Sequence, residues 1–328
     1  MNKKIIAMAV SAALAAPLLA HAGAPTVYGQ LNLHYGTVKK EAPTGTTTTD
    51  NWQFGSYDSR LGFKGERDFG NGLMGVYKIE LAINPDGTNT AIKRRNTYAG
   101  LKGGWGELRF GRHDSPLKMS QSKFDQFGDS DGDLKHAGKQ AGEHRNDNML
   151  MYLGKSDSIG YAIQIAPGEG SGVGANNSNN GPADNVSASI SYKSGPLYVA
   201  LAHDKYGNPT NLAEDSMSRL IGIYKMGNMQ LGLLYQSGVQ APAAASAKED
   251  WMGVSFGAGF SGSNKFKAQY ITSEDKATTK TKTTLTAIGM DHKFDKKTTG
   301  YLHYVEVKAT GGSPIKNDFM TVGMNLKF

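Results

Sequence analysis

Residues 27–35 read Val-Tyr-Gly-Gln-Leu-Asn-Leu-His-Tyr, and this short stretch decides the predicted fold. Its odd positions are apolar or small, whereas Gln30, Asn32 and His34 point the other way. A period of two is typical of a β-strand with one apolar and one polar face. Residues 320–328, which close the chain, alternate in the same manner. The sequence therefore begins and ends in strands of one type.

Similar alternating runs fill the sequence between these two ends, and no convincing amphipathic helix follows the N-terminal segment. They predict strands at residues 73–81, 186–192, 229–236 and 265–271. Roughly sixteen such runs can be counted, each about the length of a tilted membrane-spanning strand. No shift in composition marks a domain boundary, so residues 23–328 are predicted to form a single barrel.

The connectors between the runs are of two kinds. Residues 70–72 (Gly-Asn-Gly), 227–228 (Gly-Asn) and 295–297 (Asp-Lys-Lys) are typical of tight hairpin turns. Residues 37–50, 168–184 and 240–247 are polar, of low complexity, and predicted to be long loops. Alternation of short and long connectors places the turns on one rim of a barrel and the loops on the other.

The N-terminal 22 residues have the features of a secretory signal peptide. Lys3 and Lys4 precede an apolar run over residues 5–19, and Ala20-His21-Ala22 fits a small-x-small cleavage site. The run is too short for a membrane-spanning helix, which needs about 20 apolar residues. We therefore expect residues 1–22 to be cleaved and the mature chain to be exported.

Composition excludes several classes of function. The 328 residues include 42 glycines and no cysteine, which rules out thiolate metal sites, a cysteine nucleophile and disulfides. Eight histidines lack metal-site spacing, and no Ser/His pair can be placed together, so we expect neither a metal, nor a cofactor, nor an enzyme. The basic residues are dispersed, which argues against a nucleic-acid partner.

Two details favour a membrane barrel over a soluble secreted β-sandwich or β-solenoid, which remain the alternatives. Polar and charged side chains occur mid-strand, as in wide barrels with a wet interior. Aromatic side chains cluster at strand ends, as expected of girdles at the membrane–water interfaces. These are Tyr35, Phe69, Tyr98, Phe110, Tyr192, Tyr224, Tyr235 and Phe294.

Several motifs carry a resemblance to a known family. Residues 59–66 (Ser-Arg-Leu-Gly-Phe-Lys-Gly-Glu), 108–112 (Leu-Arg-Phe-Gly-Arg) and 124–129 (Phe-Asp-Gln-Phe-Gly-Asp) resemble the Gram-negative general porins. The resemblance implies an all-β fold, a 16-stranded antiparallel transmembrane β-barrel with an inward-folded third loop. It also implies a homotrimer in the outer membrane, and a C-terminal aromatic, Phe328, that is read by the outer-membrane assembly machinery.

The same resemblance assigns a pore constriction. Residues 113–143 form the longest connector and correspond to the inward loop, and Asp125 and Asp129 match the family's Phe-acid-x-Phe-Gly stretch best. Opposed charges at the narrowest point would set ion selectivity. The candidates on the acidic loop are Asp114, Asp125, Asp129 and Asp131, with Asp133 nearby, and those on the basic wall are Arg60, Arg95 and Lys64.

The predicted function is passive diffusion of small hydrophilic solutes and ions through a water-filled channel. Outer-membrane lipid and lipopolysaccharide are the expected surroundings. Cleavage lowers the formal charge from +7 to about +5, which favours anions. A substrate-specific outer-membrane channel is one alternative, and a barrel acting as an adhesin or receptor through its long loops is the other.

Overall fold

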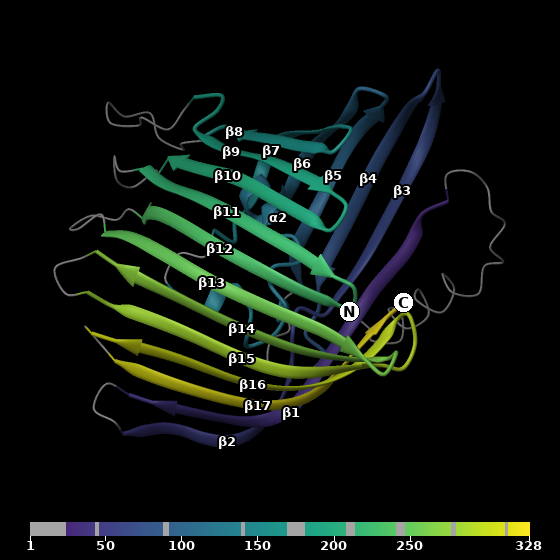
Figure 1. Ribbon diagram of the computed structural model, residues 1–328. Helices are drawn as coiled ribbons and strands as arrows, with labels where there is room; N and C mark the ends of the chain where they lie inside the picture. The colour runs from purple at the N-terminus through teal and green to yellow at the C-terminus, as the bar shows by residue number, and fades with distance from the viewer. Residues whose placement is uncertain are drawn as a thin grey trace.

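A computed structural model describes residues 24–42, 46–87, 92–138, 142–168, 181–207, 214–240, 247–276, 280–311 and 314–328. The predicted leader, residues 1–22, lies outside this set. Nearly all the regular structure is strand (Figure 1). The strands are β1 (Thr26–Glu41), β2 (Thr47–Ser56), β3 (Arg60–Gly70), β4 (Leu73–Ala82), β5 (Lys93–Gly103), β6 (Gly106–Asp114), β7 (Arg145–Ser156), β8 (Ile159–Ala166), β9 (Asn185–Ser194), β10 (Leu197–Gly207), β11 (Glu214–Met226), β12 (Met229–Gln240), β13 (Ala247–Phe260), β14 (Asn264–Asp275), β15 (Lys282–Lys293), β16 (Thr298–Thr310) and β17 (Ile315–Lys327).

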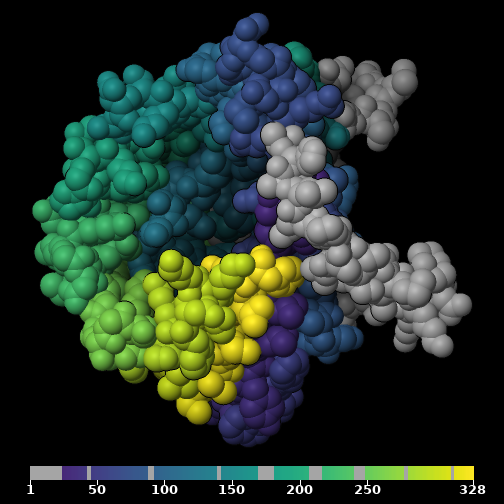
Figure 2. Space-filling model, turned by 90° about the vertical axis from the view of Figure 1, so that its right-hand side faces the viewer, coloured from purple at the N-terminus to yellow at the C-terminus, as the bar shows by residue number. Residues whose placement is uncertain are grey.

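The strands form one closed antiparallel barrel. Each strand from β3 onward pairs with the next along the chain, and β17 returns to pair with β1, where Gln30 lies opposite Lys327. On its other side β1 pairs with β2 through residues 33–41 and with β3 through residues 26–30. Because β2 and β3 share one place beside β1, the seventeen segments make the predicted barrel of sixteen strands. Figure 2, turned by 90°, shows a deeply hollowed face.

The hairpin turns follow the expected glycine and asparagine chemistry, but one predicted loop is wrong. Asn71 and Gly72 join β3 to β4 with φ angles of 52° and 75°, a region that favours these residue types. The predicted loop over residues 37–50 is instead mostly strand, because β1 runs to Glu41 and β2 begins at Thr47. Threonine is β-branched and favours an extended backbone, so a polar run rich in threonine does not indicate a loop.

The outer face of the barrel is apolar and exposed. Large hydrophobic side chains alternate along β10–β16 with exposures such as 58% for Leu233 and 62% for Met252, as a lipid-facing surface requires. Seven of the predicted girdle aromatics are exposed: four lie within two residues of a strand end, as predicted, namely Phe69, Tyr192, Tyr224 and Phe294, whereas Tyr35, Phe110 and Tyr235 lie mid-strand. The prediction for Tyr98 is wrong, since its ring packs with Met149 and Met151 and lies under the Arg109 guanidinium.

The inner face differs from the expected polar lining. Ile221, Leu234, Gly253, Ile271 and Leu285 lie directly opposite one another on consecutive strands β11–β15. Their side chains point inward, and the four with side chains are at most 4% exposed. We call this row, continued by Val307 on β16, the lumenal apolar stripe. It forms the main core of the protein together with a loop that covers it.

That loop, residues 115–144, joins β6 to β7. It contains the short helix α2 (Pro116–Ser120) and the 3-10 turn η1 (Leu134–His136). Asp114 is the last residue of β6 rather than part of the loop, because its backbone pairs with Arg145 of β7. Among the described residues, no helix is long and apolar enough to cross a membrane.

Candidate functional site

The loop is anchored at its start by α2. The Ser115 hydroxyl accepts a hydrogen bond from the Lys118 backbone N–H at 3.1 Å and so caps the helix. Leu117 is fully buried against Ala202 of β10 and Met217 of β11. The buried Arg219 donates to the Leu117 carbonyl at 3.2 Å. These contacts of α2 with β10 and β11 fix the position at which the loop leaves the wall.

The middle of the loop lies on the lumenal apolar stripe. Phe124 is fully buried, and its ring lies over Gly253, where a Cβ would come within 2.9 Å of it. Phe127 is 1% exposed and meets His303 of β16 edge-on, with ring centroids 5.1 Å apart. Burial of such a side chain contributes about 1.5–3 kcal/mol. Apolar packing therefore holds the loop against the inside of strands β11–β16.

Asp125 stands between the two anchoring rings and is half-buried. Its carboxylate accepts hydrogen bonds from the backbone N–H groups of Phe127 at 2.8 Å and Leu134 at 2.9 Å, and from Gln269 Nε2 at 3.2 Å. Burial and the neighbouring charge of Asp133 raise the pKa of Asp125 to about 7. The side chain thus shapes the loop and is placed in no ion pair with Arg60 or Arg95.

The tip of the loop reaches the wall formed by β1 and β3. Asp129 Oδ2 is 2.7 Å from Arg60 Nη2 and accepts a hydrogen bond from Gln30 Nε2 at 3.2 Å. Burial, partly offset by the positive charge of Arg60, raises the pKa of Asp129. Asp131 accepts a hydrogen bond from the Tyr57 hydroxyl. The structure therefore brings two of the predicted residues, Asp129 of the loop and Arg60 of the wall, into direct contact.

Arg95 is paired with acids that the sequence analysis did not select. Its Nη1 is 2.7 Å from Asp58 Oδ1, and its Nε is 3.0 Å from Glu80 Oε1. Lys135 of the loop lies 3.4 Å from the second oxygen of Asp58. Glu80 shares the inward face of β4 and could have been found by parity, whereas Asp58 depends on a turn that no sequence pattern indicates.

The remaining predicted residues lie further from this centre. Asp114 pairs with Arg145 Nη2 at 2.8 Å and accepts a hydrogen bond from Asn96 at 2.7 Å. Lys64 is exposed, with its Nζ 5.4 Å from the centre of the Tyr28 ring. Phe328 exchanges two backbone hydrogen bonds of 3.2 Å with Gly29 at the seam of the barrel.

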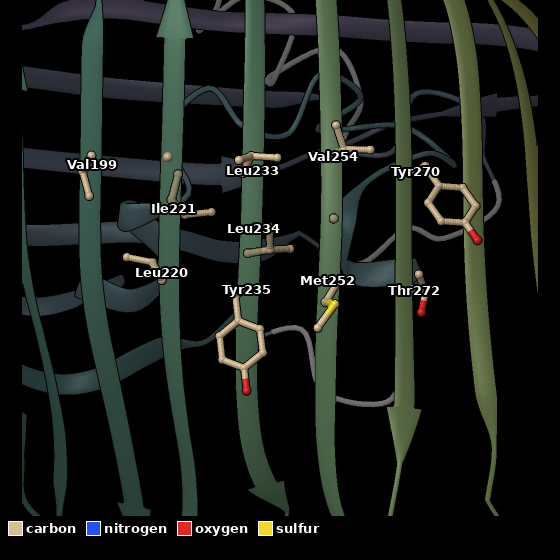
Figure 3. Close-up of a pocket in the computed structure, with 12 residues that line it drawn as sticks. Val199, Leu220, Ile221, Leu233, Leu234, Tyr235, Met252, Val254, Tyr270 and Thr272 are labelled. Carbon is tan, nitrogen blue, oxygen red and sulfur yellow. The ribbon is translucent and has the colours of Figure 1, made fainter.

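The outer wall carries a hollow of a different kind. Residues of strands β10–β14 line a depression of about 600 Å³. Figure 3 shows their side chains. Leu220, Leu233 and Met252 are among its exposed apolar residues, and only the hydroxyls of Tyr235, Tyr270 and Thr272 add polarity. This composition suits hydrocarbon and offers no catalytic constellation.

Comparison with known proteins places this architecture in a family. A sequence model of Gram-negative porins matches residues 7–312. The chain belongs to the Gram-negative porin family. As a porin it forms a channel for passive diffusion across the outer membrane, which points to transport rather than catalysis.

Relatives and solved structures agree with this assignment. The chain is 26% identical to the major outer membrane protein P.IB of Neisseria lactamica, over 90% of this chain and 100% of that protein. An anion-selective porin from Comamonas acidovorans has a similar fold, with a TM-score of 0.75, 19% identity and coverage of 93% of this chain and all of the other. The trimer form of OmpT from Vibrio cholerae superposes with a TM-score of 0.69, 18% identity and coverage of 94% and 100%.

Proposed function

We propose that residues 115–144 constrict the channel and that charges at the loop tip and the facing wall filter ions. The observation that carries the proposal is the Arg60–Asp129 ion pair of 2.7 Å, which joins the loop to the wall. Charged linings of this kind attract or repel permeant ions.

The position of the passage follows from where the loop is attached. The loop contacts the inner face from β9, where Ser187 accepts from the Leu117 N–H, round through β14 to β3. The wall of β4–β7 is left to face it across the lumen. That wall carries inward cations, each already beside a carboxylate, among them Lys78, Arg95, Arg109 and Arg145.

The quaternary and cellular setting belongs to the same proposal. A homotrimer is supported by the solved trimer form of OmpT. Export by a cleaved leader of residues 1–22, recognition of Phe328 by the assembly machinery, and contact of the exposed rim with lipopolysaccharide are further parts of it. The apolar outer face supports burial of the barrel in lipid.

Planar-bilayer recording of the purified protein tests the proposal. We expect stable open steps that close in threes, and a reversal potential in a salt gradient that changes when the Arg60–Asp129 pair is broken. Absence of any conductance would refute the channel. Conductance with a selectivity indifferent to both Arg60→Gln and Asp129→Asn would refute the constriction.

A further inference from the structure

Asp58 occupies an unusual place in the barrel wall. The strand beside β1 is interrupted at residues 57–59, between the end of β2 at Ser56 and the start of β3 at Arg60. Asp58 has a φ of 47°, in the left-handed region that glycine adopts without cost and most side chains avoid. A carboxylate is therefore present where the backbone alone would be better served by glycine.

The break turns the Asp58 carboxylate toward two cations on different parts of the molecule. One oxygen is 2.7 Å from Arg95 Nη1 on β5, and the other is 3.4 Å from Lys135 Nζ on the loop. The Asp58 carbonyl accepts a hydrogen bond from Gln30 Nε2 at 3.3 Å. Although burial acts to raise it, the charges of Lys135 and Arg95 hold the pKa of Asp58 below its ordinary value.

These contacts make Asp58 the link between the wall and the loop in a chain of ion pairs. Lys78 pairs with Glu80 at 3.0 Å and Glu80 with Arg95 at 3.0 Å, and Asp58 then links Arg95 to Lys135. The chain therefore runs from the wall at β4 to the loop. The chain continues to Asp133, whose carboxylate lies 3.6 Å from Lys135 Nζ, so it holds three cations and three carboxylates. Loss of Asp58 would leave three cations with two carboxylates.

We propose that Asp58 is a selectivity-determining residue of the pore, which masks Arg95 and Lys135 from permeant anions and ties the loop to the wall. The inference rests on the proposed function, because it requires the space between loop and wall to be the ion path. Neutral substitutions at Asp58 would remove the carboxylate that Arg95 and Lys135 share, so that Arg95 keeps only Glu80 and Lys135 only Asp133 among the ion pairs of the described residues. The expected result is a rise in chloride over potassium permeability of about two- to fivefold at low salt.

The chain offers a matched control. Asp157, in the turn between β7 and β8, has a φ of 49°, is exposed, and is in none of the ion pairs found among the described residues. Reversal potentials are measured in KCl gradients for Asp58→Asn, Asp58→Gly, Asp157→Asn and Asp157→Gly. The reversal potentials of both Asp58 variants should shift toward anion selectivity, and those of both Asp157 variants should stay at the wild-type value. The shift should shrink at about 1 M salt, because screening weakens charge effects but not structural ones.

The outcomes separate this inference from the channel itself. Open channels of Asp58→Asn and Asp58→Gly with wild-type reversal potentials would overturn the role of Asp58 and leave the porin function intact. A shift that persists undiminished in high salt would overturn it too, since the effect would then be structural. If Asp58→Gly failed to assemble, the Asp58 side chain would be required for folding, and this would overturn its role in selectivity. Absence of conductance in the wild-type protein would instead refute the proposed function.

Discussion

Substitution of Asp125 by Asn should alter selectivity only at high pH. A carboxyl with a pKa of about 7 is about 1% ionised at pH 5 and about 99% ionised at pH 9. Asparagine therefore resembles the wild-type side chain at pH 5 and lacks its charge at pH 9. A resemblance-based assignment of Asp125 as a permanent constriction acid predicts the opposite, namely the same effect at both pH values.

The size of the effect follows from Coulomb's law. A unit charge about 10 Å from a permeant ion in water changes its energy by about 0.4 kcal/mol, with opposite sign for potassium and chloride. The permeability ratio would then change about fourfold, and screening at 0.1 M salt reduces this to about twofold. Reversal potentials of wild type and Asp125→Asn are compared at pH 5, 7 and 9. Equal differences at pH 5 and 9 would refute the raised pKa of Asp125.

Loop stability should follow the same titration. Since the folded-state pKa of Asp125 lies above its ordinary value of 3.8, the docked loop holds a proton that the free loop would release. The contribution to stability is fully present below about pH 4 and is lost as pH rises through about 7, by at most about 4 kcal/mol. Hydrogen exchange of residues 115–138 should therefore speed up between pH 5 and 8, after correction for intrinsic rates, in wild type but less in Asp125→Asn.

Three other substitutions test separate parts of the site. Asp129→Asn removes the carboxylate partner of Arg60 and should favour anions about two- to fourfold at pH 7, measured as a reversal potential; an unchanged value would remove Asp129 from the constriction. Phe127→Ala should cost about 3–5 kcal/mol of loop docking and increase open-channel noise in single-channel recordings, whereas outward Phe69→Ala should not; equal noise in the two variants would contradict the anchoring role. Gly253→Val places a side chain against the Phe124 ring, so it should reproduce the Phe127→Ala noise, and a quiet channel would show that the loop does not depend on this contact.

The barrel could be predicted from the sequence because its determinants are local. Alternation in residues 27–35 and 320–328 reflects the geometry of one strand, and the Gly-Asn-Gly turn at 70–72 reflects the conformations those residues tolerate. The Arg60–Asp129 pair joins residues far apart in sequence. The resemblance of short motifs to a known family selects both residues as candidates, on the loop and on the wall, but does not predict that they pair.

The lumenal apolar stripe could not be predicted by the same means. In β11, residues 220–224 read Leu-Ile-Gly-Ile-Tyr, which is apolar on both faces, so alternation disappears where the loop docks. The rule that inward residues are polar holds only where the lumen is wet. A continuous apolar run within an otherwise alternating barrel is the signal that something covers the inner face.

In the loop of residues 115–144, apolar packing and charge have different roles. Phe124, Phe127 and Leu134 fix the loop on the stripe through burial, which no salt concentration screens. Asp129, Asp131 and Lys135 add contacts to the wall at Arg60, Tyr57 and Asp58. Because the apolar anchors hold the loop in place, the charges at its tip can change sign or disappear with little loss of the fold. On the proposed function, we expect ion selectivity to depend on residues 57–60 and 129–135 more than on the overall charge of the chain.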